Sequence, residues 1–101
     1  MQDIEKVAFL VRNPGDVWEC TRSCVGLAIE NLNVGLFIID ATVEMEERTK
    51  DYLDLLEMID DLEGRIFTNV SNNAERFSFM NYMSLKDMAR EIRKYDLLTV
   101  F

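Results

Sequence analysis

The sequence predicts a three-layer α/β/α fold built on a mainly parallel sheet of four or five strands. Short apolar runs typical of buried strands alternate with stretches in which apolar residues recur every three or four positions, as in helices. The stretches between strands are long enough for right-handed crossovers, which connect parallel strands and place helices on both faces of a sheet. With 101 residues, the chain has room for one domain, residues 1–101, and not for two.

The first two predicted strands are each followed by a helix. Residues 7–11 form a continuous apolar run of the kind found in strands buried on both faces. A helix over about 16–31 should follow, because Asp16 and Glu19 are spaced as in a capping box. Residues 34–39 repeat the buried-strand pattern and give the second strand.

The middle of the chain predicts a long helix, a third strand and a short edge strand. Over residues 44–63, apolar side chains recur at three- and four-residue spacing and define one helical stripe. Gly64 stands where a left-handed residue would end that helix, and residues 65–70 give the third strand pattern. Residues 71–73 have the composition of a turn, and residues 80–83 predict a brief edge strand.

The last part of the chain predicts a helix and a closing strand. Ser84 and Asp87 are spaced as a second capping box. One apolar face of the helix that follows is formed by Leu85, Met88, Ala89, Ile92 and Tyr95. Residues 97–101 are apolar and uncharged, and they predict a final strand held in the sheet.

Composition excludes several classes of function. The chain has 11 Lys and Arg residues against 19 Asp and Glu residues, so its charge of -8 would repel nucleic acid. It has no His, which removes the usual general base, the usual neutral metal ligand and every imidazole-dependent triad. No apolar run approaches the roughly 20 residues of a membrane span, and no secretory leader is evident, so we expect a cytoplasmic location and no membrane contact.

Polar residues follow the predicted strands at the edge of the sheet where ligands of parallel α/β folds bind. Anion or small-ligand binding there would use Asn13, Asp40, Thr42, Asn69, Ser71, Asn72 and Asn73. Turn formation is the other reading, because Asn and Ser side chains satisfy nearby backbone groups. The loop after the first strand lacks a phosphate-binding glycine pattern, and we expect no cofactor.

Cys20 and Cys24 lie four residues apart on the first predicted helix and therefore share a face. They are either small apolar residues that pack the helix on the sheet or reactive thiols, and Cys20 lies nearer the helix start, where a thiolate is favoured. We expect no metal, because the chain offers no His and no further Cys.

Opposite charges concentrate on two predicted helices. Residues 44–63 are strongly acidic, whereas residues 86–94 are mainly basic. The acidic face is either a solvated exterior or a docking surface for a basic partner. Electrostatically guided self-association is one consequence of this asymmetry, and a dipole across a single protomer is the other.

The chain resembles the DsrE/DsrF/DsrH-like family of small α/β sulfur-relay proteins, which includes the Tus sulfur carriers. The resemblance spans nearly the whole length and rests on residues 6–11, 26–28, 64–67, 84–89 and 95–101. It implies a parallel-sheet core, a cytoplasmic location, and homo- or hetero-oligomers that pass a persulfide sulfur to a partner protein.

The sequence departs from the family at its principal cysteine. DsrE-like members carry sulfur on a Cys after the third strand, and residues 68–73 contain none. DsrH-like members place a Cys on the first helix, so the resemblance assigns any sulfur-carrying role to Cys24 or Cys20. Three functions follow: an accessory subunit or sulfur carrier, a noncatalytic binding module for a small or nucleotide-like ligand, and, ranked last, an enzyme.

Overall fold

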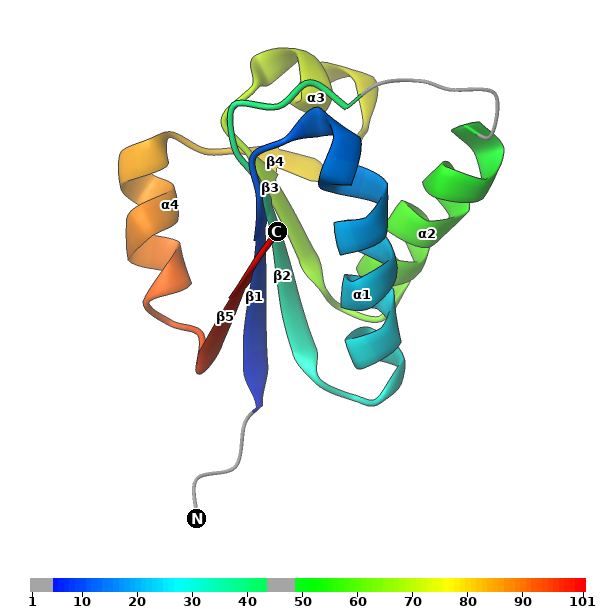
Figure 1. Cartoon of the computed structure of the whole chain (residues 1–101), viewed down its shortest axis with the longest axis vertical. Helices are drawn as coiled ribbons and strands as arrows, with labels where there is room; N and C mark the ends of the chain where they lie inside the picture. The colour runs from blue at the N-terminus through cyan, green and yellow to red at the C-terminus, as the bar shows by residue number, and fades with distance from the viewer. Residues whose placement is uncertain (1–4, 44–48) are drawn as a thin grey trace.

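The computed structural model describes residues 5–43 and 49–101 and confirms the α/β fold (Figure 1). The strands form one five-stranded, all-parallel sheet. In chain order the elements are β1 (Lys6–Val11), η1 (Pro14–Asp16), α1 (Val17–Ile29), β2 (Asn33–Ile38), α2 (Thr49–Asp61), β3 (Arg65–Thr68), α3 (Ser71–Arg76), β4 (Met80–Tyr82), α4 (Leu85–Ile92) and β5 (Leu97–Val100).

The strand order is β4-β3-β2-β1-β5, so the chain steps outward from β1 to β4 and then returns past β1 to place β5. A right-handed crossover puts its helix on one face when the chain steps one way and on the other face when it steps back. Accordingly, α1 and α2 lie on one side of the sheet and α4 on the other, while α3 lies at the carboxyl end (Figure 1). Of the described helices, α4 alone covers its face.

The core is divided by the sheet because side chains alternate along each strand. On the α1 and α2 face, Val7, Phe9 and Val11 of β1 join a large cluster of buried apolar side chains. On the α4 face, a smaller cluster contains Ala8, Phe37, Ile39, Phe67 and Met88. The buried-strand predictions for residues 7–11 and 34–39 are confirmed, except that residue 39 lies beyond the end of β2.

The start of the first helix differs from the predicted capping box. A short 3-10 turn precedes α1, and the Asn13 side-chain oxygen accepts a hydrogen bond from the Gly15 N–H at 2.9 Å. The Asp16 side chain accepts no capping hydrogen bond from the described backbone. Asp16 is thus the N-cap residue of α1 as predicted, but the capping-box hydrogen bond was predicted wrongly, and the side-chain cap is instead made by Asn13 on the 3-10 turn that Pro14 begins.

The boundary between α2 and β3 also corrects a prediction. Part of the predicted helix, residues 44–48, lies outside the described residues, and α2 spans Thr49–Asp61. The left-handed residue that follows is Glu63, with φ of 66°, and not Gly64. Gly64 is instead needed for space, since a Cβ there would lie 2.7 Å from Cγ2 of Ile59.

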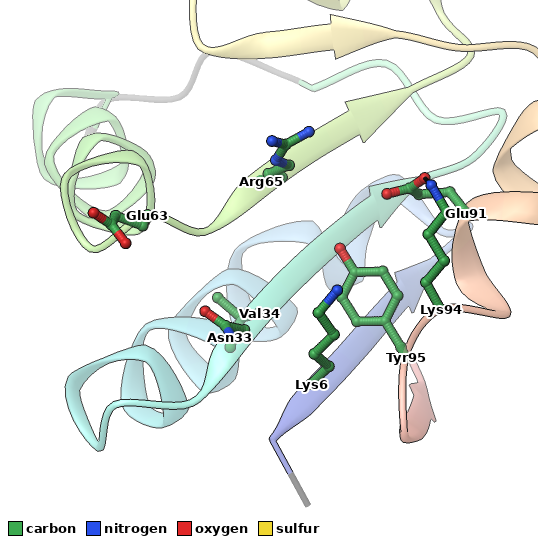
Figure 2. Close-up of a pocket in the computed structure, with 8 residues that line it drawn as sticks. All are labelled: Lys6, Asn33, Val34, Glu63, Arg65, Glu91, Lys94 and Tyr95. Carbon is green, nitrogen blue, oxygen red and sulfur yellow. Dashed lines mark ion pairs between the residues drawn. The ribbon is translucent and has the colours of Figure 1, made fainter.

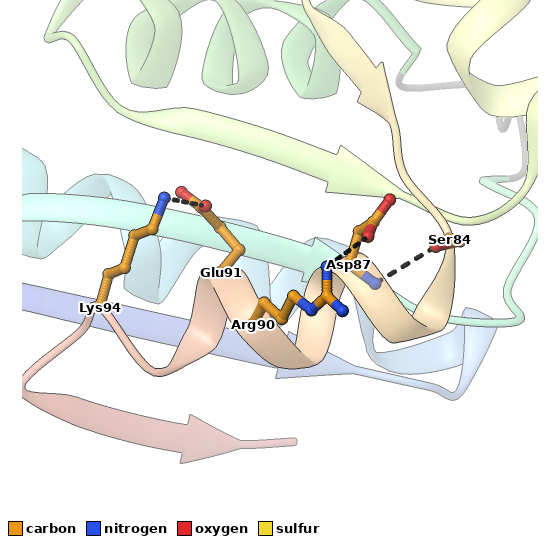
Figure 3. Close-up of polar contacts among 5 residues, drawn as sticks. All are labelled: Ser84, Asp87, Arg90, Glu91 and Lys94. Atoms are coloured by element: carbon orange, nitrogen blue, oxygen red, sulfur yellow. Dashed lines mark hydrogen bonds and ion pairs between the residues drawn. The ribbon is translucent and has the colours of Figure 1, made fainter.

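The third strand is shorter than predicted, and the expected turn is helical. β3 ends at Thr68, and residues 71–73 belong to α3. The predicted edge strand is confirmed as β4, Met80–Tyr82. Ser84 caps α4 by accepting the Asp87 N–H at 3.2 Å (Figure 3).

The apolar face of α4 is narrower than its sequence stripe. Met88 is buried, and Ile92 and Tyr95 pack beside it against the sheet. Leu85 and Ala89 are exposed, contrary to prediction, because a helix of eight residues turns only part of its surface to the sheet. Across residues 5–43 and 49–101, every helix falls short of the length and apolar character needed to cross a bilayer.

Candidate functional site

The predicted site lies at the carboxyl edge of the sheet, where the loops after β2 and β3 meet. The Asp40 N–H donates to Oδ1 of Asn69 at 2.8 Å, and Nδ2 of Asn69 donates to Oδ1 of Asp40 at 2.7 Å. Asp40 adopts a left-handed backbone conformation, with φ of 53°. The two predicted site residues are thus brought together, and their side chains are occupied by each other.

Asn73 is a buried support for the same loops. Its Nδ2 donates to the Ala41 carbonyl oxygen at 2.8 Å and to Oγ1 of Thr68 at 3.1 Å. Its Oδ1 accepts the Val43 N–H at 2.9 Å. Because the side chain is fully buried and uses both its donor and its acceptor, Asn73 fixes the loop after β2 to β3.

Arg76 is a residue of this region that the sequence analysis did not single out. Its Nη2 donates to the Val43 carbonyl oxygen and lies 3.4 Å from Oδ1 of Asn73. The guanidinium group also lies 5.2 Å from the ring centroid of Phe77. The sequence feature that could have drawn attention to Arg76 is that it is the sole basic residue between Arg65 and Lys86.

The other predicted binding residues lie at the surface. Thr42, Ser71 and Asn72 are exposed. Asn13 is exposed as well, but its side-chain oxygen is used to cap η1. The polar groups at this edge that can still reach a ligand therefore come mainly from Thr42 and the first turn of α3.

The two cysteines lie on the buried face of α1. Both are fully buried and belong to the apolar cluster between the helices and the sheet. Burial, with a smaller contribution from the negative charge of Asp16, raises the pKa of Cys20 to about 12. Burial and the neighbouring Cys20 also raise the pKa of Cys24. At neutral pH both thiols are protonated, whereas sulfur transfer requires a thiolate.

The described part of the chain offers no obvious metal centre. In it, His, Cys, Asp and Glu side chains do not gather in groups of three or more that could hold an ion.

A hollow of about 330 Å³ lies at the opposite, amino-terminal edge of the sheet, on the α4 face (Figure 2). Its lining includes Lys6, Arg65, Lys94 and Tyr95, none of which the sequence analysis predicted as site residues. The available signal was Gly35, because a glycine inside a strand often marks the close approach of another group.

The outer edge of β5 is an exposed apolar surface. Leu97 and Leu98 are 45% and 44% exposed, and Val100 is 63% exposed. Phe101, which follows the strand, is also exposed and lies 6.4 Å from Phe9, centroid to centroid. No described strand pairs with the outer side of β5.

Fold and surface together define the class of an α/β protein with an all-parallel sheet, buried thiols and an exposed apolar edge strand. Comparison of the chain with protein-family models, curated proteins and solved structures finds no match.

Proposed function

We propose that this chain is a noncatalytic accessory subunit of a DsrE-like sulfur-transfer assembly in the cytoplasm, and that it self-associates through the outer edge of β5. The exposed apolar edge of β5 is the observation that supports self-association. The sequence resemblance supplies the link to sulfur transfer, and the parallel-sheet core that it implies is present.

β5 lacks two of the features that keep edge strands from pairing, namely charge and proline. Natural edge strands are protected by charge, proline, bulges or short length. Residues 97–101 contain neither charge nor proline, and β5, with four residues, is one residue longer than the opposite edge strand β4. The unpaired backbone groups of β5 and its apolar side chains both favour the addition of a strand.

Two residues of opposite charge near the ends of β5 support a second copy of this chain as the partner, against a net charge of -8. Asp96, whose Oδ2 accepts hydrogen bonds from the N–H groups of Glu5 and Lys6, precedes β5, and Arg12 follows β1 beside the carboxyl end of β5. Arg12 forms no ion pair with a carboxylate of residues 5–43 and 49–101. Antiparallel pairing of two β5 strands about a two-fold axis would bring Asp96 of each copy toward Arg12 of the other.

Burial of Cys20 and Cys24 supports the noncatalytic version over the carrier. A carrier must expose a thiolate to both donor and acceptor proteins, and these thiols are enclosed in the core with raised pKa values. The alternative function, a binding module based on the strand-end loops, has less support, because Asn69 and Asn73 are already hydrogen-bonded within the protein.

Sedimentation velocity of the whole chain tests the association. Val100→Lys places a charge on the proposed interface, while Ile29→Lys on α1 is the matched control, since Val100 is 63% and Ile29 60% exposed. We expect the unaltered chain and Ile29→Lys to sediment as dimers and Val100→Lys as a monomer. A monomeric unaltered chain, or a Val100→Lys variant that stays dimeric, would contradict self-association through β5.

Alkylation of the native protein tests the noncatalytic assignment. We expect iodoacetamide to leave Cys20 and Cys24 unmodified in the folded protein and to modify both in urea, as measured by intact mass. Treatment with a low-molecular-weight persulfide should likewise add no sulfur to the folded chain. Rapid labelling of either thiol in the native state would restore the carrier hypothesis.

A further inference from the structure

The hollow at the amino-terminal edge is a consequence of the sheet topology. The helices α1 and α2 cover one face of the sheet (Figure 1), and on the other face the hollow lies beside the short helix α4, with a lining that includes the first residues of β1, β2 and β3 (Figure 2). The volume of about 330 Å³ lies at the lower end of the range for small-molecule pockets, which begins near 300 Å³.

Cationic residues from three separate parts of the chain line this hollow. Lys6 begins β1, Arg65 begins β3, and Lys94 follows α4. The lining also includes the carboxylates Glu63 and Glu91. The local balance is therefore positive, although the chain as a whole carries a charge of -8.

Two of these cations remain available to a ligand. Nζ of Lys94 lies 3.0 Å from Oε2 of Glu91, so these two groups neutralise each other (Figure 3). Arg65 and Lys6 form no ion pair with a carboxylate in the described ranges, and Nζ of Lys6 lies 5.7 Å from the centroid of the Tyr95 ring.

Tyr95 adds an uncommitted hydrogen-bond donor beside Arg65. Its ring crosses β2 at Gly35, where a Cβ would lie 2.3 Å from the tyrosine hydroxyl oxygen. Gly35 is in register with Arg65 on the adjacent strand, and both face α4. The hydroxyl forms no hydrogen bond with the described residues, and burial together with the Glu91 charge raises the pKa of Tyr95, so the group keeps its proton at neutral pH.

We propose that this hollow binds the phosphate group of a small phosphomonoester, with Arg65 and Lys6 as the charged donors and the Tyr95 hydroxyl as a neutral one. A guanidinium group matches phosphate oxygens with two parallel hydrogen bonds, and an ammonium group adds a point charge. Glu91 opposes binding because it repels the anion and holds Lys94. This site is independent of the association through β5.

Titration with inorganic phosphate, followed by ¹H–¹⁵N NMR at constant ionic strength, tests the site. Arg65→Ala should weaken binding by at least about tenfold, the factor that ~1.4 kcal/mol represents, because a hydrogen bond to a charged group contributes more than that. Glu91→Gln should tighten binding by about threefold, because one like charge is removed and Lys94 is released. Arg65 is exposed and Glu91 is half-buried, and circular dichroism would check that both variants fold.

Arg90→Ala is the matched control, because Arg90 is an exposed arginine of α4 that lies 4.0 Å from Asp87 and outside the lining (Figure 3). Phosphate affinity should be unchanged in this variant, and shifts in the unaltered chain should concentrate around Gly35 and Arg65. Equal weakening by Arg90→Ala and Arg65→Ala would show nonspecific charge attraction and overturn the site. Absence of saturable shifts in the unaltered chain would overturn it as well.

Discussion

Replacing Asn73 with Ala should lower the free energy of unfolding by about 2–5 kcal/mol. The variant leaves the Val43 N–H and the Ala41 carbonyl without their present partners in a fully buried setting. Each such group costs ~1–3 kcal/mol, and water that enters the vacated space recovers part of that cost. The loss is a large fraction of the roughly 5–15 kcal/mol by which domains are stable.

Urea unfolding at neutral pH, followed by circular dichroism, measures this cost. Asn72→Ala is the control on the same turn of α3, because Asn72 is exposed and its replacement should change stability by no more than about 0.5 kcal/mol. Asn73→Asp should be damaging too, since a carboxylate cannot donate to the Ala41 carbonyl. If Asn73→Ala were as mild as Asn72→Ala, the structural role argued for Asn73 would be wrong.

Three further predictions concern other parts of the molecule. Gly35→Ala should lower the free energy of unfolding by about 1–3 kcal/mol through a clash with Tyr95, and most of this loss should vanish when Tyr95 is also replaced by Ala. Equal losses with and without Tyr95, measured by urea unfolding, would refute the clash. Hydrogen bonds from backbone N–H groups lower the pKa of Asp96 in the folded protein, so the ionised side chain should stabilise the fold above about pH 3.8 and lose this effect as the pH falls through its folded-state pKa. The urea midpoint of Asp96→Asn should lack this dependence on acid pH. Burial raises the pKa of Cys20 from 9.0 to about 12, so stability should fall as the pH rises through this interval, and less steeply in Cys20→Ala; an unchanged alkaline slope would contradict the burial argument.

The fold was predictable because the strands of the sheet interior are apolar on both faces. Residues 7–11 and 34–39 were recognisable as strands for this reason, and the helical pattern between them indicated that strands and helices alternate along the chain. The exact ends of the helices were less predictable, since several neighbouring residues can each cap a helix or take the left-handed conformation. Asn13 caps the 3-10 turn before α1 while the Asp16 side chain makes no capping hydrogen bond, and Glu63 takes the left-handed conformation beside Gly64.

The functional surfaces were harder to predict than the fold. Sequence composition could place Asn69 and Asn73 after a strand, but only the structure shows that their amides are used by Asp40 and by the backbone after β2. The hollow at the amino-terminal edge depends on strand order, which places Lys6 and Arg65 in one lining from opposite halves of the chain. Spacing along the sequence carries no trace of that proximity.

The position of β1 has a consequence for biosynthesis. Its two sheet partners are β2, which follows closely, and β5, which is synthesised some ninety residues later. Until β5 leaves the ribosome, one side of β1 has no strand paired with it, and this apolar strand is an edge of the nascent sheet. The sheet can therefore be completed only after β5 has left the ribosome, and holding chaperones would have their greatest effect before then.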